Sequence, residues 1–497
     1  MNSKLEVLKR LEIGERVAEE ESDNLEKYFV ETDQWQQMWD GNIDVVYGPK
    51  GSGKSALYTL LNKKEDSLFD NGVLIASGEN LRGATVFRSI VTDPPPTEMA
   101  FIYLWKLYCL SLIGRALRDY DIKNEDARSL VKSLETAKLL PTSDKLSVIF
   151  RAVTTYLKNW LNRDARSIEY AVNIDPSTGA ATVSRKTEFG DSTDDKNLGD
   201  IPVDDLLNIA DAAMQNEDLT LWILFDRLDV AFAESQELER NALRALFRAY
   251  NDIKAYSNIA LKIFVRDDIW KRITQGGFTE ASHITKSVHI SWTEESLLNL
   301  IVLRLINSPN LIDYLGINPN AIKSDYEKQH EMLYRLIPDQ VDTGKNPKTF
   351  NWIVSRTTDS TKNSVPREVI HLIDEAKGIP IQKLERGSEE PGNEFLFDRS
   401  SLKEALTKVS KIRYEQTLLA EYPDILPYLE KLEGEKCEHT INSLSRFWEL
   451  DISQATTIAK KLTEIGFFEW RGSKENPSFW VPFLYRGALK LVQGKSV

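Results

Sequence analysis

The chain has 497 residues, a formal net charge of -13 and a sequence pI near 5.2, with 41% hydrophobic and 28% charged residues. This length predicts two to four domains, and the acidic balance argues against a surface coated in basic charge for nucleic acid. Neither cysteine, Cys109 or Cys437, has the spacing of a disulfide framework or a metal site. Because residues 1–10 lack a secretory apolar core and the apolar run 100–114 favours a buried helix, we expect a cytoplasmic protein with no membrane partner.

Apolar patterning, taken in chain order, predicts alternating strands and helices. Residues 4–40 indicate one or two lead-in helices, and a helix follows at 55–62. Strands are predicted at 43–47, 73–77, 219–225, 259–265 and 287–292. Helical patterns such as 237–255 separate the later strands, and this alternation is typical of an α/β fold with a parallel sheet covered on both faces.

The remaining segments predict additions to this sheet. Residues 97–161 are helical in pattern, 170–189 suit a β-hairpin, 191–200 suit a loop, 294–377 are almost all helical and 378–399 suit a linker. We therefore expect five parts: 1–96, N-terminal helices and the first part of the core; 97–200, a helical insertion with a hairpin; 201–292, the second part of the core; 293–380, a helical lid; and 400–497, a winged-helix-like domain.

Residues 48–55 (GPKGSGKS) match the phosphate-binding pattern G-x-x-x-x-G-K-[ST], between a predicted strand and a predicted helix. Glycines allow a tight turn whose backbone N–H groups face phosphate oxygens. Lys54 is expected to reach the β- and γ-phosphates of ATP, and the Ser55 hydroxyl to ligate Mg2+. The alternative is a chance turn rich in glycine and lysine. The expected nucleotide contacts are Gly48, Pro49, Lys50, Gly51, Ser52, Gly53, Lys54, Ser55 and Ala56.

A second carboxylate motif follows the predicted strand 219–225. Asp226 would stand at the carboxyl edge of the sheet, where a Mg2+ ion beside the phosphates needs a carboxylate. Many hydrolytic relatives have Glu at the next position, but Arg227 stands there and cannot accept a proton. Asp229 is the nearest acidic candidate for polarising water, and the alternative is that Asp229 caps a helix.

Two further positions suit contact with the nucleotide. The predicted strand 259–265 leads into Arg266, which could face the γ-phosphate or could pair with Asp226 or with the acidic residues after it. Residues 364–368 (SVPRE) open a predicted helix, where Pro366 is ordinary helix punctuation. Arg367 could close over the nucleotide.

Together, GPKGSGKS, WILFDRLD, KIFVRDD and SVPRE resemble AAA+-like ATPases that have an additional strand between the two Walker motifs. The chain is most similar to STAND signalling ATPases of the NB-ARC type and to origin-recognition initiator ATPases. It also resembles a poorly characterised bacterial family of stand-alone P-loop ATPases, which implies a role in anti-phage defence. The resemblance implies a γ-phosphate contact for Arg266, a base contact for Pro366, or instead a second sensor at Arg367.

Residues 438–497 show a helix, a turn, a second helix and two strand-like runs, which is the order of a winged helix. Residues 441–497 carry eight basic and five acidic residues, a balance of +3 that permits DNA contact. The alternative is a winged helix used for protein packing.

Three functions compete at this stage. The first is a regulated, slowly hydrolysing ATPase switch that self-associates or acts on a separate effector protein. The second is a DNA-binding ATPase of the initiator or loader type. The third is a kinase built on the same scaffold, although the sequence shows no acceptor-site motif.

Overall fold

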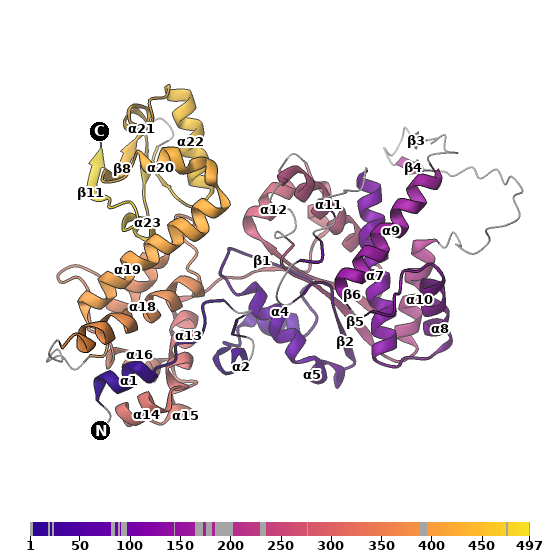
Figure 1. The fold of residues 1–497 in the computed structure, drawn as a ribbon, viewed down its shortest axis with the longest axis horizontal. Coiled ribbons are helices and arrows are strands. Elements are labelled where there is room, and N and C mark those ends of the chain that lie inside the picture. Colours follow the sequence, from indigo (N-terminus) through magenta and orange to yellow (C-terminus); the bar gives the residue numbers. More distant parts are fainter. Residues whose placement is uncertain are drawn as a thin grey trace, which may run out of the picture. The chain divides into compact units, whose positions relative to one another are not determined.

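The computed structural model describes residues 3–17, 20–21, 24–80, 85–87, 90, 97–143, 145–164, 172–174, 181–183, 202–228, 235–275, 277–387, 395–473 and 476–496. The chain forms two compact units (Figure 1). The helical unit comprises Met1–Trp39, Gly48–Leu60 and His289–Val497, and the sheet unit comprises Asp40–Tyr47 and Leu61–Val288. The part boundaries expected from the sequence stay predictions.

The sheet unit is built on a five-stranded sheet in the order β2-β5-β6-β1-β7. The strands are β1 (Val45–Gly48), β2 (Val73–Ser77), β5 (Thr220–Phe225), β6 (Ile259–Arg266) and β7 (Ser287–His289). Parallel pairing joins β2 to β5 and β5 to β6. All five predicted strands are present, although β7 ends three residues earlier than expected. Because β6 lies between β1 and β5, the additional strand expected between the two Walker motifs is confirmed.

Helices cover this sheet and form most of the predicted insertion (Figure 1). They are α5 (Glu65–Phe69), α7 (Glu98–Asp119), α8 (Glu125–Thr136), α9 (Leu146–Asp164), α10 (Val203–Gln215), α11 (Gln236–Ile253), α12 (Asp267–Thr274) and the 3-10 helix η2 (Thr279–His283). The predicted hairpin is present but shorter, with β3 (Val172–Ile174) pairing antiparallel to β4 (Ala181–Val183). The loop expected at 191–200 lies outside the described residues.

Helix α7 contains the apolar run that the sequence predicts to be a buried helix. It is 22 residues long and, by length and composition, could cross a membrane, but 89% of its apolar window is buried within the protein. Inside the sheet unit, Tyr108 donates a hydrogen bond to the carbonyl of Gly78 (2.8 Å), and Trp105 donates to the carbonyl of Ala242 (2.8 Å). These contacts identify α7 as a core helix, as expected.

A buried ion pair fixes β1 beside β6. Lys262, in the middle of β6, donates to the carboxylate of Asp44 (2.9 Å) and to the carbonyl of Ile43 (2.6 Å), while its amine lies 4.3 Å from the ring of Trp222. Burial lowers the pKa of Lys262 below its ordinary value. Breaking a pair buried this completely costs about 3–5 kcal/mol, so it holds the strand that delivers the phosphate loop.

The helical unit contains the lead-in segment and the predicted lid. Three lead-in helices, one more than the upper expectation, are α1 (Lys4–Arg10), α2 (Leu25–Tyr28) and α3 (Asp33–Trp39). The lid helices are α13 (Glu294–Ile306), α14 (Pro309–Leu315), α15 (Pro319–Ile322), α16 (Tyr326–Tyr334), α17 (Thr349–Thr357) and α18 (Pro366–Glu385). The expected start of the linker at residue 378 is wrong because α18 continues to Glu385 with Pro380 inside it. Ile379 and Pro380 are buried, so the helix stays packed across the breaker residues Gly378 and Pro380.

The C-terminal segment has the predicted helix–turn–helix and hairpin, with additions. Its helices are α19 (Arg399–Arg413), the π-helical turn η3 (Tyr414–Leu419), the 3-10 turn η4 (Pro423–Ile425), α20 (Leu426–Glu430), α21 (Ile441–Trp448), α22 (Ile452–Glu464) and α23 (Phe483–Arg486). Its sheet has the order β11-β8-β10-β9, from β8 (Lys436–Thr440), β9 (Glu469–Gly472), β10 (Pro477–Trp480) and β11 (Val492–Ser496). Sequence patterning missed β8 and β11, and it assigned to a strand the residues that form α23.

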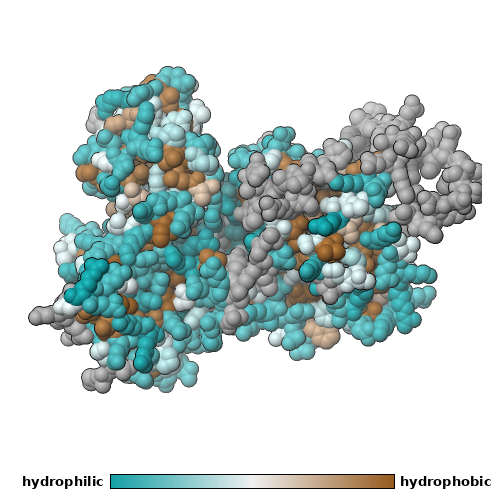
Figure 2. Space-filling model, viewed as in Figure 1, coloured by the Kyte–Doolittle hydropathy of each residue, from teal (hydrophilic) through white to brown (hydrophobic). Residues whose placement is uncertain are grey.

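The visible surface is mostly hydrophilic, with apolar residues in scattered groups (Figure 2). The large apolar side chains that are exposed come from separate elements: Phe69, Met99, Tyr314, Tyr326, Ile452 and Val492. Isolated apolar residues of this kind are normal on a protein surface.

Candidate nucleotide-binding site

The phosphate loop connects β1 to α4 (Lys54–Lys63). The loop turns at Gly51 (φ 86°) and Gly53 (φ 102°), in a backbone region that favours glycine. A side chain at position 51 would also meet the Cβ of Arg367 at 3.0 Å. The predicted strand–loop–helix frame is therefore present, with glycine where the turn and a close approach require it.

The key loop lysine is buried and held by the loop itself. The Lys54 amine donates to the carbonyl oxygens of Gly48 (2.8 Å) and Pro49 (2.9 Å). Ser55, the expected Mg2+ ligand, is the second residue of α4 and is half-buried, as is Ala56. The N-terminus of this helix adds a partial positive charge at the loop, which suits an anion.

Three contacts within the helical unit join the loop to the lid and the C-terminal segment. The indole of Trp292 donates to the carbonyl of Ser52 (2.8 Å), and Arg367 lies against Gly51. Lys50 pairs with Glu421 at 2.5 Å, just beyond η3. The loop therefore contacts residues that lie 240 or more positions further along the chain.

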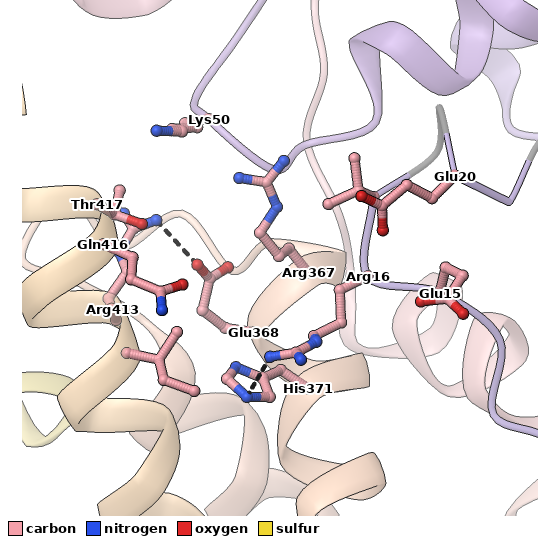
Figure 3. Close-up of a pocket in the computed structure, with 12 residues that line it drawn as sticks. Glu15, Arg16, Glu20, Lys50, Arg367, Glu368, His371, Arg413, Gln416 and Thr417 are labelled. Carbon is pink, nitrogen blue, oxygen red and sulfur yellow. Dashed lines mark hydrogen bonds and ion pairs between the residues drawn. The ribbon is translucent and has the colours of Figure 1, made fainter. Parts of the chain in front are cut away.

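A pocket of about 290 Å3 lies beside these contacts in the helical unit. Figure 3 shows the Lys50 amine and the Arg367 guanidinium on the same side of it. The Nε of Arg367 is buried and has no hydrogen-bond partner among the described residues. Pro366 is buried at the first turn of α18, so the helix start holds Arg367 at the pocket.

The other walls of the pocket carry paired charges (Figure 3). Arg413 donates to the Glu368 carboxylate (2.8 Å), and Arg16 lies 2.6 Å from the Nε2 atom of His371. Burial, reinforced by Arg16, lowers the pKa of His371 to about 4, so this imidazole is neutral at pH 7. The pocket can therefore present positive charge from arginine and lysine without a charged histidine.

In the sheet unit, the carboxyl ends of β5 and β6 bring Asp226 and Arg266 to one edge. Phe225 pairs with Ile263, so Asp226, which is buried, stands level with Phe264, and Arg266 stands two residues beyond it. Arg266 makes two hydrogen bonds of 3.0 Å to the Asp268 carboxylate. Among the described contacts of Arg266, this is the pairing that the sequence left open as the alternative to a phosphate contact.

The Asp268 carboxylate belongs to a longer charge network. Arg272 donates to Asp268 (3.3 Å) and to the buried carboxylate of Glu239 (2.6 Å). Although burial alone raises the pKa of Asp268, Arg266 and Arg272 outweigh it and hold the pKa below its ordinary value. Asp268 is therefore ionised at pH 7 and anchors Arg266 at the strand end.

The turn after Asp226 is unusual. Arg227 adopts a left-handed backbone (φ 54°), which costs a non-glycine residue about 1–2 kcal/mol, and its guanidinium donates to the carbonyl of Asn80 (3.3 Å). The candidate base Asp229 lies outside the described residues. Sequence reasoning missed a buried acid on the neighbouring strand end, Glu79, although a charged residue two positions beyond the apolar run 73–77 was a visible signal.

The residue types fit a Mg2+–nucleotide complex better than a protein-only metal site. Within the described ranges, no group of three or more His, Cys, Asp or Glu could hold a metal ion. Mg2+ usually takes one or two protein oxygens together with water and phosphate oxygens, and a serine hydroxyl such as that of Ser55 or a carboxylate such as that of Asp226 is an oxygen ligand of this kind.

The C-terminal segment presents fewer available basic groups than its composition suggests. Lys461 pairs with Asp424, Lys490 with Glu433 (2.7 Å) and Lys495 with Glu438 (3.5 Å). Arg471 pairs with Glu469 (3.1 Å) and lies 3.9 Å from the ring centre of Trp480. At least four of the eight basic residues are thus engaged in ion pairs with described residues.

The loop, the sheet order and the strand-end acid define an α/β protein of the P-loop class with the strand arrangement of AAA+-like ATPases. No family model matches the chain, and no curated protein matches it. Among solved structures, it is similar over most of its length to two proteins of Aeropyrum pernix.

One is the ORC1 protein in complex with DNA, at 11% identity and a TM-score of 0.37, covering 92% of this chain and 91% of that chain. The other is the ORC2 protein in its ADPNP–ADP complexes, at 12% identity and a TM-score of 0.31, covering 91% and 90%. Both TM-scores are low, and the P-loop class of this chain is defined by its own loop and sheet.

Proposed function

We propose that the chain binds ATP with Mg2+ through residues 48–56, hydrolyses it slowly and acts as a nucleotide-dependent switch. The carrying observation is that the phosphate loop contacts the lid and the C-terminal segment within one compact unit, through Trp292, Arg367 and the Lys50–Glu421 pair. A phosphate entering the loop would compete for Lys50 and Lys54, so nucleotide binding would change these contacts.

Each predicted residue has a role in this proposal. Lys54 would exchange two carbonyl hydrogen bonds for charge-assisted bonds to the β- and γ-phosphates. Ser55 and Asp226 would ligate Mg2+, and Pro366 would set Arg367 against the nucleotide. Arg266 would face the γ-phosphate while Asp268 holds its guanidinium in place. Asp229 would either polarise water or cap a helix, the two alternatives that the sequence leaves open.

Nucleotide binding is tested by titrating the full chain with a fluorescent ATP analogue and Mg2+. Lys54→Ala should weaken binding by at least tenfold, because about 1.5–3 kcal/mol is lost with each hydrogen bond to a charged group. Lys63→Ala is the matched control, since Lys63 is an exposed lysine at the other end of the same helix. Equal affinity for the wild type and Lys54→Ala would contradict a phosphate loop.

The switch is tested by light scattering of the same proteins with and without a non-hydrolysable ATP analogue. Self-association that appears with the analogue in the wild type, and not in Lys54→Ala, supports it. An unchanged monomer in both conditions would count heavily against the switch. A defence role stays an implication of the resemblance, and a phage challenge of cells that carry the wild type or Lys54→Ala tests it.

A DNA-binding ATPase of the initiator type is the second candidate. The helix–turn–helix and hairpin of α21, α22, β9 and β10 favour it. The ion pairs of Lys461, Arg471, Lys490 and Lys495 weigh against it. Filter binding across a salt series separates the candidates, because phosphate contacts give an affinity that falls steeply with salt. Absence of binding at low salt removes the second candidate.

A further inference from the structure

The carboxyl end of β2 holds a buried acid for which the proposed function has no role. Glu79 lies two residues beyond β2 and is 1% exposed. Its carboxylate accepts hydrogen bonds from the Thr85 hydroxyl (2.5 Å) and from the backbone N–H groups of Asn80 (2.6 Å) and Val86 (3.3 Å). These donors fix the orientation of a group that is costly to bury, and such groups often mark functional sites.

The sheet places Glu79 beside Asp226. Ser77 pairs with Leu224 in parallel register, and the Gly78 N–H donates to the carbonyl of Leu224 (2.8 Å). Glu79 and Asp226 therefore each stand two residues beyond the last pair of neighbouring strands, which lie about 4.8 Å apart. A side chain at position 78 would meet the ring of Phe225 at 2.4 Å, so this close approach requires glycine.

A second contact joins the ends of β2 and β5. The guanidinium of Arg227 donates to the carbonyl of Asn80, which adjoins Glu79. Arg227 also occupies the position where many hydrolytic relatives have the glutamate that accepts a proton from water. Glu79, just beyond the neighbouring strand β2, thus supplies the carboxylate that is missing after Asp226.

We propose that Glu79 is the proton acceptor for the water that attacks ATP, an assignment that depends on the proposed function above. The water oxygen bonds to the γ-phosphorus while the bond from that phosphorus to the β–γ bridging oxygen breaks. The electron pair of the broken bond stays on the diphosphate, and the proton of the water passes to the Glu79 carboxylate and then to solvent. The Thr85 hydroxyl keeps the carboxylate oriented.

The surroundings of Glu79 also suit proton acceptance. Burial raises the pKa of Glu79 above its ordinary value, although its hydrogen bonds and Arg227 oppose the shift. A carboxylate with a raised pKa is a better base near neutral pH. The competing role is purely structural, in which Glu79 only fixes the turn from Asn80 to Val86.

Glu79→Gln separates these roles because glutamine keeps the shape and one acceptor oxygen. Wild type, Glu79→Gln and Asp229→Asn are compared as full chains for the affinity of a fluorescent ATP analogue, the midpoint of thermal unfolding and phosphate release. We expect Glu79→Gln to bind within about threefold of the wild type and to release phosphate at least about 100-fold more slowly. ATP recovered from this variant after incubation should be intact. Asp229→Asn compares the two candidate acids: loss of turnover in Asp229→Asn with turnover kept in Glu79→Gln would overturn the assignment to Glu79.

Thr85→Val is a second variant in case Glu79→Gln folds poorly, and it should slow phosphate release about tenfold at unchanged affinity. Wild-type turnover in Glu79→Gln would overturn the assignment, and so would affinity and unfolding midpoint falling together with turnover. A wild type that binds ATP and releases no phosphate also overturns it. A wild type that fails to bind ATP at all contradicts the proposed function instead, so the two failures are distinguishable.

Discussion

Arg266 lies at a strand end where an arginine can pair with a carboxylate and also face a phosphate. Its guanidinium makes two hydrogen bonds to Asp268, yet it stands at the sheet edge where a γ-phosphate would lie. Asp268 therefore positions Arg266 at the strand end, and we expect this pairing to persist when a γ-phosphate is bound.

His439 gives the protein a measurable pH dependence. It is fully buried in β8 beside Phe447, and burial lowers its pKa to about 4 from 6.5. Below pH 6.5 the His439 imidazole is protonated in the unfolded chain, whereas in the folded protein it is protonated only below about pH 4. The free energy of unfolding is therefore unaffected above pH 6.5 and falls below it, by about 2 kcal/mol at pH 5.

His439→Leu should remove this contribution, as measured by thermal unfolding at pH 7.5 and pH 5.0. The pKa of His371 is also lowered to about 4, so His371 keeps part of the acid sensitivity in both proteins. His439→Leu should therefore lose less stability than the wild type between pH 7.5 and pH 5.0, but it should still lose some. An equal loss in the variant and the wild type would show that His439 does not carry the effect.

At the scale of elements, Gly378 and Gly316 form a matched pair for testing how helices are specified. A side chain at either position would meet no atom within 4 Å. Gly378 lies inside α18, whereas Gly316 ends α14 with a left-handed backbone (φ 61°). Gly378→Ala should raise the free energy of unfolding by about 0.5–1 kcal/mol, and Gly316→Ala should lower it by about 1 kcal/mol.

Denaturant unfolding of the two variants checks this prediction. Because both sites are sterically open, packing cannot explain opposite signs for the two changes in the free energy of unfolding. The backbone conformation at each glycine explains them. A destabilising Gly378→Ala would contradict the assignment of residue 378 to a helix interior, and a stabilising Gly316→Ala would contradict the left-handed backbone at residue 316.

The strands of the central sheet were predictable because buried parallel strands are continuous apolar runs. β5 has five of its six residues buried, and its apolar run gave its position within one residue. β8 (KCEHT) was not predictable, since its buried positions are occupied by Cys437 and His439 among polar residues. The apolar run at 478–486 predicts one strand, but only its first residues belong to β10 (Pro477–Trp480), and Pro482 caps the short helix α23 (Phe483–Arg486).

The candidate site was predictable only where a local motif defines it. The loop and Asp226 follow from strand–turn patterns that a single segment contains. Glu79 depends on Thr85 and Val86 further along the chain and on pairing with β5, which no local pattern reveals. The contacts of Lys50 with Glu421 and of Trp292 with Ser52 join segments hundreds of residues apart for the same reason.

At the scale of the whole molecule, the loop belongs to the same compact unit as the lid and the C-terminal segment, while the strand-end acid belongs to the sheet unit. A nucleotide held by Lys54 would therefore act on a loop that contacts the lid and the C-terminal segment within its own unit. These contacts are the physical reason to expect that nucleotide state, and not merely fold stability, governs the conformation of the chain.

Hydrogen exchange of the full chain, with and without a non-hydrolysable ATP analogue and Mg2+, tests this claim most directly. The account predicts that the analogue slows exchange in residues 49–56 and also in the lid at 365–372 and the strand end at 225–228, and that Lys54→Ala abolishes all three effects. Unchanged exchange in the loop at saturating analogue, or protection of the loop with no change in the lid and the strand end, would contradict it.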